Sequence, residues 1–260
     1  MPHLLNVWPS VSRKLSGAFR VLLLFDYDGT LTPIVARPEI AILSDETRRL
    51  LSLMAGMDRF VVGVVSGRGL ADLESLVAIP GLVYTGNHGL EISGAGMDFV
   101  HPEAPAFKET LAEVASLLVQ GLAGVPGIVV DNKRLTLTVH FRSTPDSYSE
   151  QVNDTVLATA RPYVDAGLMK ITRGKKVVEV RPNIDWGKGK AIEQIRKNCG
   201  DSPLPVFFGD DETDEEGFVT VQDAGGVAVY IGGTRQNTKA LHQLESPQEV
   251  AQVLALLTQL

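Results

Sequence analysis

Two apolar runs in this sequence end in aspartates, and they constrain the fold more than any other feature. The first is VLLLFDYDG, residues 21–29, and the second is VFFGDDETD, residues 206–214. Unbroken apolar runs of this length are typical of strands buried on both faces of a parallel sheet. The carboxylates then lie at the carboxyl ends of the strands, where open α/β sheets place their ligands.

The first run carries Asp26 and Asp28, which point the same way in an extended chain because side chains alternate along a strand. Taken alone, this pattern fits a simple turn after a strand equally well. The second run repeats it with Asp210, Asp211 and Asp214. Two solvated loops have no reason to repeat the pattern, so we expect a shared site.

Apolar periodicity predicts alternating strands and helices in the first hundred residues. We expect strands at 21–25, 60–65 and within 81–86, with a helix over 45–55 capped by Ser44 and another after Ser66. After residue 183 the alternation returns, with a helix over 188–198, a strand at 205–211 and a closing helix. Ser246 and Glu249 suggest a capping box for that last helix. This order predicts a doubly wound, Rossmann-like parallel sheet.

The middle of the chain has a different pattern, with the order α-β-β-α-β-β. We expect helices over 106–122 and 147–165, a hairpin joined at 131–134, and a second hairpin turning at Gly174. This predicts a small antiparallel sheet with helices on one face. The chain is therefore expected to form an α/β catalytic core, residues 1–100 and 183–260, with an inserted α+β lid (cap) domain, residues 101–182.

Composition excludes several partners. The 260 residues carry 24 Lys+Arg against 31 Asp+Glu, a net charge of −7, and no basic run, so we expect no nucleic-acid binding. The single cysteine, Cys199, excludes an intrachain disulfide and a cysteine metal cluster. The N-terminus lacks the order of a signal peptide and no apolar run reaches membrane-spanning length. A cytoplasmic protein without a membrane or an obligate protein partner is expected.

Converging aspartates repel one another unless a cation lies between them. Oxygen ligands favour Mg²⁺, which invites phosphoryl transfer. Ser66, Gly67 and Arg68 follow a buried strand and open a helix, so their hydroxyl and N–H groups can hold phosphate oxygens. Lys188, in GKGKA, can add a positive charge. Each position alone also fits a helix cap or a solvated lysine.

The motifs DYDGT, VVSGR, GKGKA and GDDETD occur in this order, and together they resemble the haloacid dehalogenase superfamily of phosphatases. The resemblance implies that Asp26 is a nucleophile that becomes an aspartyl-phosphate and that Asp28 is the general acid and base. It also implies Mg²⁺ held by Asp26, the backbone carbonyl of Asp28 and Asp210. Asp211 and Asp214 would then orient these ligands without binding the ion themselves.

The lid strands carry a polar face that bears on the substrate. In LTLTVHFR, residues 135–142, apolar and polar side chains alternate, and KKVVEVRP continues the pattern. Alternation alone favours an ordinary solvated face. The same face can also hydrogen-bond sugar hydroxyls through His140, Arg142, Glu179 and Arg181.

The longer motifs DYDGTLTPI, GNHGLE, VHFR, VEVRP and GDDETDEEGF are similar to those of trehalose-6-phosphate phosphatases. This resemblance implies hydrolysis of trehalose 6-phosphate, a small-molecule sugar phosphate, to trehalose and phosphate. It places Asn87, His88 and Glu91 at the mouth between core and lid. It places Asp131, Lys133, Arg142 and Glu179 against the sugar.

Other functions stay open from the sequence. Close relatives of that family act on sucrose 6-phosphate and on glycosyl-glycerate or glycosyl-glycerol phosphates. A non-catalytic sugar-phosphate sensor would keep the same folded frame. A phospho-receiver domain also combines an acidic pair with Ser/Thr and Lys, but it needs neither the second catalytic aspartate nor an inserted lid.

Overall fold

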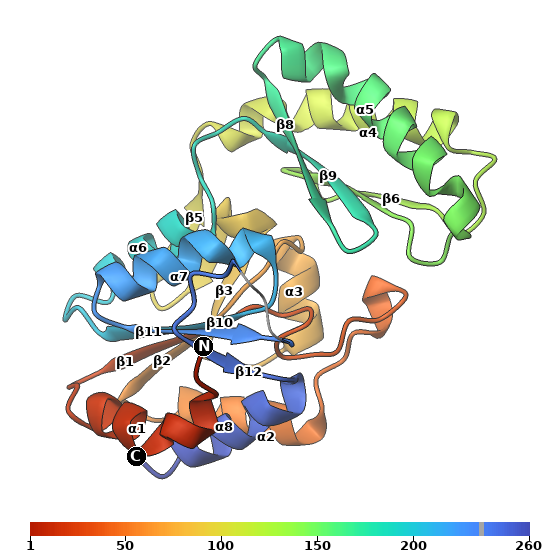
Figure 1. Ribbon diagram of the computed structural model, residues 1–260. Coiled ribbons are helices and arrows are strands. Elements are labelled where there is room, and N and C mark those ends of the chain that lie inside the picture. The colour runs from red at the N-terminus through yellow and green to blue at the C-terminus, as the bar shows by residue number, and fades with distance from the viewer. Residues whose placement is uncertain (234–236) are drawn as a thin grey trace. The chain divides into compact units, whose positions relative to one another are not determined.

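The computed structural model describes residues 1–233 and 237–260, which form two compact units (Figure 1). The core unit comprises Met1–Val35, Glu39–Phe99 and Trp186–Leu260. The insert unit comprises Ala36–Pro38 and Val100–Asp185. Among the described residues, no helix combines the length and the apolarity that crossing a membrane requires.

The core unit is built on a sheet with the strand order β12-β11-β10-β1-β2-β3-β4-β5. Its strands are β1 (Val21–Phe25), β2 (Phe60–Val65), β3 (Val83–Gly86), β4 (Glu91–Gly94), β5 (Met97–Val100), β10 (Leu204–Gly209), β11 (Val227–Ile231) and β12 (His242–Leu244). Neighbouring strands from β12 to β3 are parallel, and β4 pairs with β3 in the antiparallel direction. The predicted doubly wound parallel sheet is confirmed, with an antiparallel extension at one edge.

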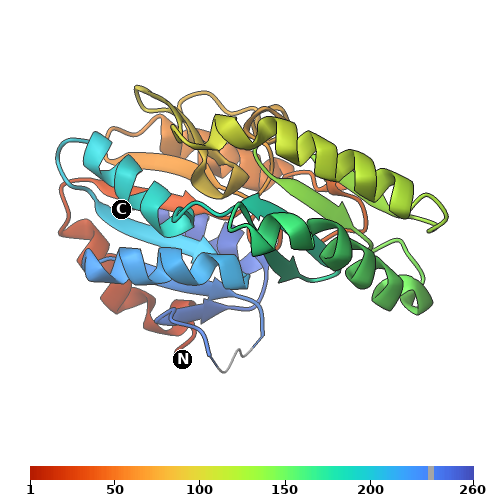
Figure 2. The same cartoon turned by 90° about the horizontal axis from the view of Figure 1, so that it is seen from above.

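Helices cover both faces of this sheet. They are α1 (Trp8–Ser16), α2 (Asp45–Ala55), α3 (Leu70–Val77), α6 (Lys188–Asn198), α7 (Glu215–Asp223) and α8 (Pro247–Leu257), with short 3₁₀ turns η1 (Leu4–Val7), η2 (Pro38–Ile40), η3 (Asn87–Gly89) and η6 (Glu212–Asp214). Figure 1 shows α6 and α7 on one face and α1, α2 and α8 on the other. Figure 2 shows α6 and α7 side by side, in contact.

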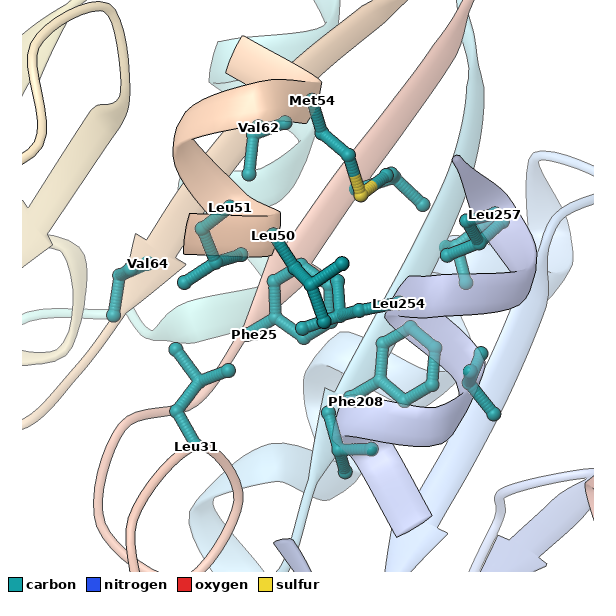
Figure 3. Close-up of a cluster of buried hydrophobic side chains, with 14 of the residues drawn as sticks. Phe25, Leu31, Leu50, Leu51, Met54, Val62, Val64, Phe208, Leu254 and Leu257 are labelled. Atoms are coloured by element: carbon teal, nitrogen blue, oxygen red, sulfur yellow. The ribbon is translucent and has the colours of Figure 1, made fainter. Parts of the chain in front are cut away.

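Strand β1 is buried along its whole length and β10 from Pro205 onward, because apolar side chains cover them on both faces. Phe25 of β1 and Phe208 of β10 stack with ring centroids 4.8 Å apart. Leu50 of α2 and Leu254 of α8 lie beside these rings, and Met54 of α2 belongs to the same hydrophobic cluster (Figure 3). A strand in this position has no solvated face, which explains its unbroken apolar sequence.

The insert unit has the predicted order α-β-β-α-β-β. Its elements are α4 (Lys108–Gly121), β6 (Val129–Asn132), β7 (Leu137–His140), α5 (Ser149–Asp165), β8 (Met169–Gly174) and β9 (Val177–Pro182), with turns η4 (Ala104–Phe107) and η5 (Asp146–Tyr148). The strands form an antiparallel sheet in the order β6-β7-β9-β8. Leu111 and Leu118 of α4 and Val156 of α5 pack with Val139 and Val180 of this sheet in a separate hydrophobic core.

Several local predictions need correction. The first hairpin joins at residues 133–136, because Asp131 and Asn132 belong to β6. The second turns at Lys175 and Lys176, because Gly174 belongs to β8. The capping box of α8 is absent: the side chain of Ser246 makes no capping hydrogen bond. Glu249 instead accepts from the backbone N–H of Glu245 at 2.7 Å.

The sequence pattern also missed several elements of the core unit, namely α1, α7, β4, β5, β11 and β12. The run VAVYI of β11 is a fully buried strand and carries the same signal as β1. In contrast, β12 has three residues, too few for a period to be visible. Its register next to β11 and the N-terminal segment comes from tertiary pairing, including the bridge between His3 and Gln243.

Candidate active site

Three buried aspartates meet at the carboxyl ends of β1 and β10. Asp26 directly follows β1, Asp210 directly follows β10, and Asp214 closes the turn η6. One carboxylate oxygen of each lies within 4.8 Å of the others. Parallel pairing of β1 with β10 produces this arrangement, because it brings residues 184 positions apart to the same sheet edge (Asp26 and Asp210).

Lys188, the first residue of α6, lies between two of these carboxylates. Its Nζ donates to Oδ1 of Asp26 at 2.8 Å and to Oδ1 of Asp214 at 2.7 Å, and its side chain is 2% exposed. Burial alone would lower the pKa of Lys188, but Asp214 and Asp26 outweigh burial and raise it. The two carboxylates thus favour the charged form of Lys188, and because its side chain is buried, the solvated-loop alternative is wrong.

The cluster carries more negative than positive charge. Burial raises the pKa of Asp26 well above its ordinary value; Lys188 opposes this shift, and Asp214 and Asp210 add to it. One lysine does not balance three carboxylates in a buried place. A further cation would relieve this repulsion, so the cluster has the charge of a cation site.

Asp214 is held on both of its oxygens. Oδ1 accepts from Lys188, and Oδ2 accepts from the backbone N–H groups of Asp210 and Asp211, each at 3.0 Å. Asp211 uses its side chain to accept from the backbone N–H of Glu212 at 2.7 Å. Asp214 thus aligns both the lysine and the loop after β10, while Asp211 caps the next turn.

Asp28 is engaged by Arg68 rather than by the aspartate cluster. The guanidinium donates from Nε to Oδ2 at 2.7 Å and from Nη2 to Oδ1 at 2.8 Å, a two-pronged pair, and from Nη1 to Asp72 at 3.0 Å. Burial lowers the pKa of Arg68, but the bonds to Asp28 and Asp72 and their negative charges together outweigh it and raise the pKa. Gly29 has φ +92°, and a side chain there would collide with the Asp210 carboxylate. The turn therefore requires glycine after Asp28.

Ser66 and Gly67 lie in the loop after β2, next to this pair. The predicted helix does not open at Ser66, because α3 begins at Leu70 with Gly69 as its N-cap. The Ser66 hydroxyl accepts from the backbone N–H of Arg68 at 3.2 Å and is buried. Arg68, which we expected to bind substrate, already bonds two carboxylates. The i,i+4 spacing of Arg68 and Asp72 was the sequence signal for this role.

Asn87, His88 and Glu91 follow β3. The Asn87 amide donates to Oε2 of Glu91 at 2.6 Å, and both Asn87 and His88 are buried. Their backbone N–H groups bond to the loop after β2, with Asn87 donating to the Arg68 carbonyl at 2.7 Å and His88 to the Ser66 carbonyl at 3.0 Å. The structure therefore brings these residues to Ser66 and Arg68 within the core unit.

The insert sheet carries a row of polar residues on the face opposite its hydrophobic core. Asp131, Thr138, Glu179 and Thr172 are cross-strand neighbours over all four strands. Oε1 of Glu179 accepts from Lys133 Nζ and from the Thr138 hydroxyl, both at 3.1 Å. Glu179 is 7% exposed. The row is a connected network, which an ordinary solvated sheet face does not require.

The other predicted residues of this sheet occupy different places. His140 lies two residues beyond Thr138 in β7, opposite Val129, with Nε2 3.9 Å from Asp131 Oδ2. Arg181 is buried opposite Lys170. Arg142 lies beyond the end of β7, and its Nε donates to the Lys175 carbonyl at 2.9 Å. It is therefore placed at the hairpin end, away from the Glu179 row. Thr138 and Thr172, which the sequence analysis did not assign to the site, complete the network.

Comparison with known proteins agrees with this geometry. The sequence profile of the trehalose-phosphatase family matches residues 24–250. The chain belongs to this family, whose members are phosphoric monoester hydrolases. The resemblance inferred from the motifs is thereby confirmed, and a phospho-receiver domain is no longer a candidate.

Individual relatives extend over nearly the whole chain. Probable trehalose-phosphate phosphatase 4 of Oryza sativa is 34% identical over 270 residues, covering 99% of this chain and 71% of the rice protein. Trehalose-phosphate phosphatase B of Arabidopsis thaliana is 29% identical, with 99% and 71% covered. The C-terminal domain of Candida albicans trehalose-6-phosphate phosphatase superposes with a TM-score of 0.84 at 25% identity, covering 100% of this chain and 98% of that domain.

Proposed function

We propose that this family member is a Mg²⁺-dependent phosphatase that converts trehalose 6-phosphate to trehalose and phosphate through an aspartyl-phosphate on Asp26. One observation carries the proposal: the carboxylate of Asp26 is buried at the end of β1, bonded to Lys188, with Asp28 two residues further on. The names of the rice and Arabidopsis relatives support the reaction.

The residues of the cluster fit Mg²⁺. Asp26, Asp210 and Asp214 offer carboxylate oxygens, and the described residues of this cluster include no histidine or cysteine. Hard oxygen ligands suit Mg²⁺, and the surplus of negative charge favours a divalent cation. Asp26 and Asp210, with the Asp28 carbonyl, would hold it, since both oxygens of Asp214 already have donors. Bound Mg²⁺ would neutralise the charge of the phosphate.

In the first step, an oxygen of Asp26 attacks phosphorus and the bond from phosphorus to the sugar oxygen breaks. Asp28 can act as the acid once one of its two bonds to Arg68 is released and that oxygen is protonated. It then gives this proton to the sugar oxygen, so the sugar leaves as an alcohol. Lys188 stays charged beside Asp26 and stabilises the negative charge on the transferred phosphoryl group. The Ser66 hydroxyl lies in the neighbouring loop, where it can donate to a phosphate oxygen.

In the second step, water attacks the phosphorus of the aspartyl-phosphate. Asp28, now ionised, takes a proton from this water, and the bond from phosphorus to Asp26 breaks to release inorganic phosphate. One carboxylate thus acts first as acid and then as base. Arg68 orients it from two sides, through the bonds to Oδ1 and Oδ2.

The Glu179 network supports a sugar phosphate as the substrate. Charged and hydroxyl groups on one sheet face can meet several sugar hydroxyls, and a small phosphate ester would not need them. We further propose that the enzyme needs no obligate protein partner to bind its substrate and that it acts in the cytoplasm. A single cysteine, half-buried, fits a reducing compartment.

Phosphate release from a panel of sugar phosphates tests the proposal. We expect trehalose 6-phosphate to be hydrolysed faster than sucrose 6-phosphate and glycosyl-glycerol phosphate. Asp26→Asn should abolish release, because an amide is not a competent nucleophile. A clear preference for another sugar phosphate would reassign the substrate. Release by Asp26→Asn within about tenfold of wild type would refute the nucleophile.

A further inference from the structure

The insert unit starts and ends at two aromatic residues of the core unit. Its main segment, Val100–Asp185, follows Phe99 and precedes Trp186, both of which belong to the core unit. Their rings contact each other, with centroids 5.6 Å apart and planes inclined by 31°. The core-unit residues that flank the segment Val100–Asp185 on its two sides are therefore in contact through their aromatic rings.

Trp186 also makes a directed bond to the turn η3. Its indole N–H donates to the backbone carbonyl of Gly89 at 2.7 Å. This bond connects residues 97 positions apart in the sequence. It is one of the contacts that hold the turn after β3 in place, and it is independent of the ring contact with Phe99.

The turn that receives this bond has an unusual backbone. Asn87, His88 and Gly89 have successive φ values of 50°, 56° and 98°. Side chains disfavour this left-handed region, so a run of two such residues before glycine persists only where the surroundings determine it. A side chain at Gly89 would place its Cβ 2.5 Å from Cβ of Ala191 and 3.1 Å from Nε1 of Trp186. The turn thus fits closely between α6 and the indole.

Residues 87 and 88 of this turn donate hydrogen bonds to the Ser66–Arg68 loop, which is proposed to hold phosphate. Asn87 donates to the Arg68 carbonyl at 2.7 Å, and His88 donates to the Ser66 carbonyl at 3.0 Å. Arg68 holds both oxygens of Asp28. Hydrogen bonds therefore connect the indole N–H to the left-handed turn and this turn to the backbone carbonyls of Ser66 and Arg68. The Arg68 side chain then bonds the carboxylate of Asp28.

We infer that Trp186 is a positioning residue for the phosphate chemistry. Its N–H holds the turn 87–89 and thereby sets the Ser66–Arg68 loop. The role of Trp186 rests on the proposed function, which assigns the phosphate to the Ser66–Arg68 loop and names the sugar substrate. The indole N–H bonds to the Gly89 carbonyl, so its effect on the Ser66–Arg68 loop runs through the backbone of the turn 87–89.

Trp186→Phe tests the inference, since it keeps a ring beside Phe99 and deletes the N–H donor. We expect kcat to fall on the order of tenfold for trehalose 6-phosphate and equally for an aryl phosphate, because both need the same loop. Inhibition by orthophosphate should weaken to a similar degree. Trp8→Phe, at the other tryptophan of the chain, is the matched control and should leave all three values unchanged.

Hydrogen–deuterium exchange supplies a readout that does not depend on turnover. In Trp186→Phe the amides of Asn87 and His88 should exchange at least about tenfold faster than in wild type, while the thermal midpoint stays within a few degrees. Phe99→Leu keeps the bond from the Trp186 N–H to the Gly89 carbonyl and should change these two exchange rates less. If the variant does not fold, benzothienylalanine at position 186 removes only the N–H.

Two results would overturn the inference. One is unchanged turnover together with unchanged exchange at residues 87–88. The other is a loss confined to the sugar substrate, which would mean that Trp186 acts through the insert unit alone. Failure of wild type to hydrolyse trehalose 6-phosphate would refute the proposed substrate instead, and the aryl phosphate, orthophosphate and exchange measurements would still decide the role of Trp186.

Discussion

A single buried ammonium group connects the two halves of the aspartate cluster. Lys188 donates to Asp26 and Asp214, which come from different elements. At the residue scale, its removal would leave both carboxylates without their cation in a place where burial already raises the pKa of Asp26. A buried ion pair that loses one partner costs about 3–5 kcal/mol of stability.

Lys188→Ala should therefore lose activity by on the order of 10²-fold or more and also lower the thermal midpoint. Steady-state phosphate release and a thermal melt measure both effects. Lys190→Ala is the control, since Lys190 lies on the same helix and is exposed. A change of less than about threefold for Lys188→Ala would contradict its role beside Asp26.

Arg68 offers a second prediction at this scale. The planar guanidinium donates to the two oxygens of Asp28 from two separate nitrogens, so Arg68→Lys keeps the charge but loses this pair of parallel bonds. We expect kcat to fall roughly tenfold or more for sugar and aryl phosphates. Asp72→Ala removes only the bond to a carboxylate that is 58% exposed and should cost little. Equal losses in both variants would mean that Arg68 acts through Asp72.

Close packing of α6 against α7 positions Lys188 at the scale of the element. Gly189 allows this approach, because a Cβ at that position would lie 2.8 Å from the Thr220 hydroxyl and 2.9 Å from the Glu216 carbonyl. Gly189→Ala should push the two helices apart, at a cost of about 1–3 kcal/mol, and shift Lys188. Thermal melts and turnover should both report it. Gly124→Ala, with no atom within 4 Å, is the control and should be nearly neutral.

Glu179 lies at the centre of the polar row that crosses the four strands of the insert sheet. Glu179 accepts from Lys133 and Thr138, so Glu179→Gln changes the charge at the centre of the row and keeps its shape. We expect kcat/KM for trehalose 6-phosphate to fall by a factor that corresponds to about 1–3 kcal/mol of lost transition-state stabilisation. The kcat/KM for an aryl phosphate should not change. Arg161→Ala, on the exposed surface of α5, serves as control. Equal losses on both substrates would exclude a role in reading the sugar.

For the whole molecule, cation binding and folding should be linked. Mg²⁺ that binds only the folded chain stabilises it by about 2.7 kcal/mol at a hundredfold excess over Kd. The thermal midpoint should therefore rise by several degrees with Mg²⁺, and a chelator should abolish both the rise and the activity. Asp210→Asn should lose most of the response, because it removes a carboxylate of the cluster. A full response in that variant would place the ion elsewhere.

The elements that could be predicted were those whose own residues decide them. Burial of β1 and β2 appears in the sequence as unbroken apolar runs, and both strands have the predicted bounds. Ser44 accepts from the Thr47 N–H and caps α2 as expected. The capping box of α8 was wrong, since Glu249 accepts from the backbone N–H of Glu245 instead. The strand β12 was missed because three residues are too few to show a period.

Apolar runs along the chain predict the parallel sheet with its acidic strand ends, and the motifs identify the trehalose-phosphatase family. Tertiary structure alone decided which side chains meet. Lys188 bonds to Asp26 across 162 positions, Arg68 to Asp28 across 40, and Trp186 to Gly89 across 97. A local sequence pattern depends on neighbouring residues and therefore predicts burial and strand or helix. The bonds named above connect residues far apart in the sequence, so they form only when packing brings those residues together.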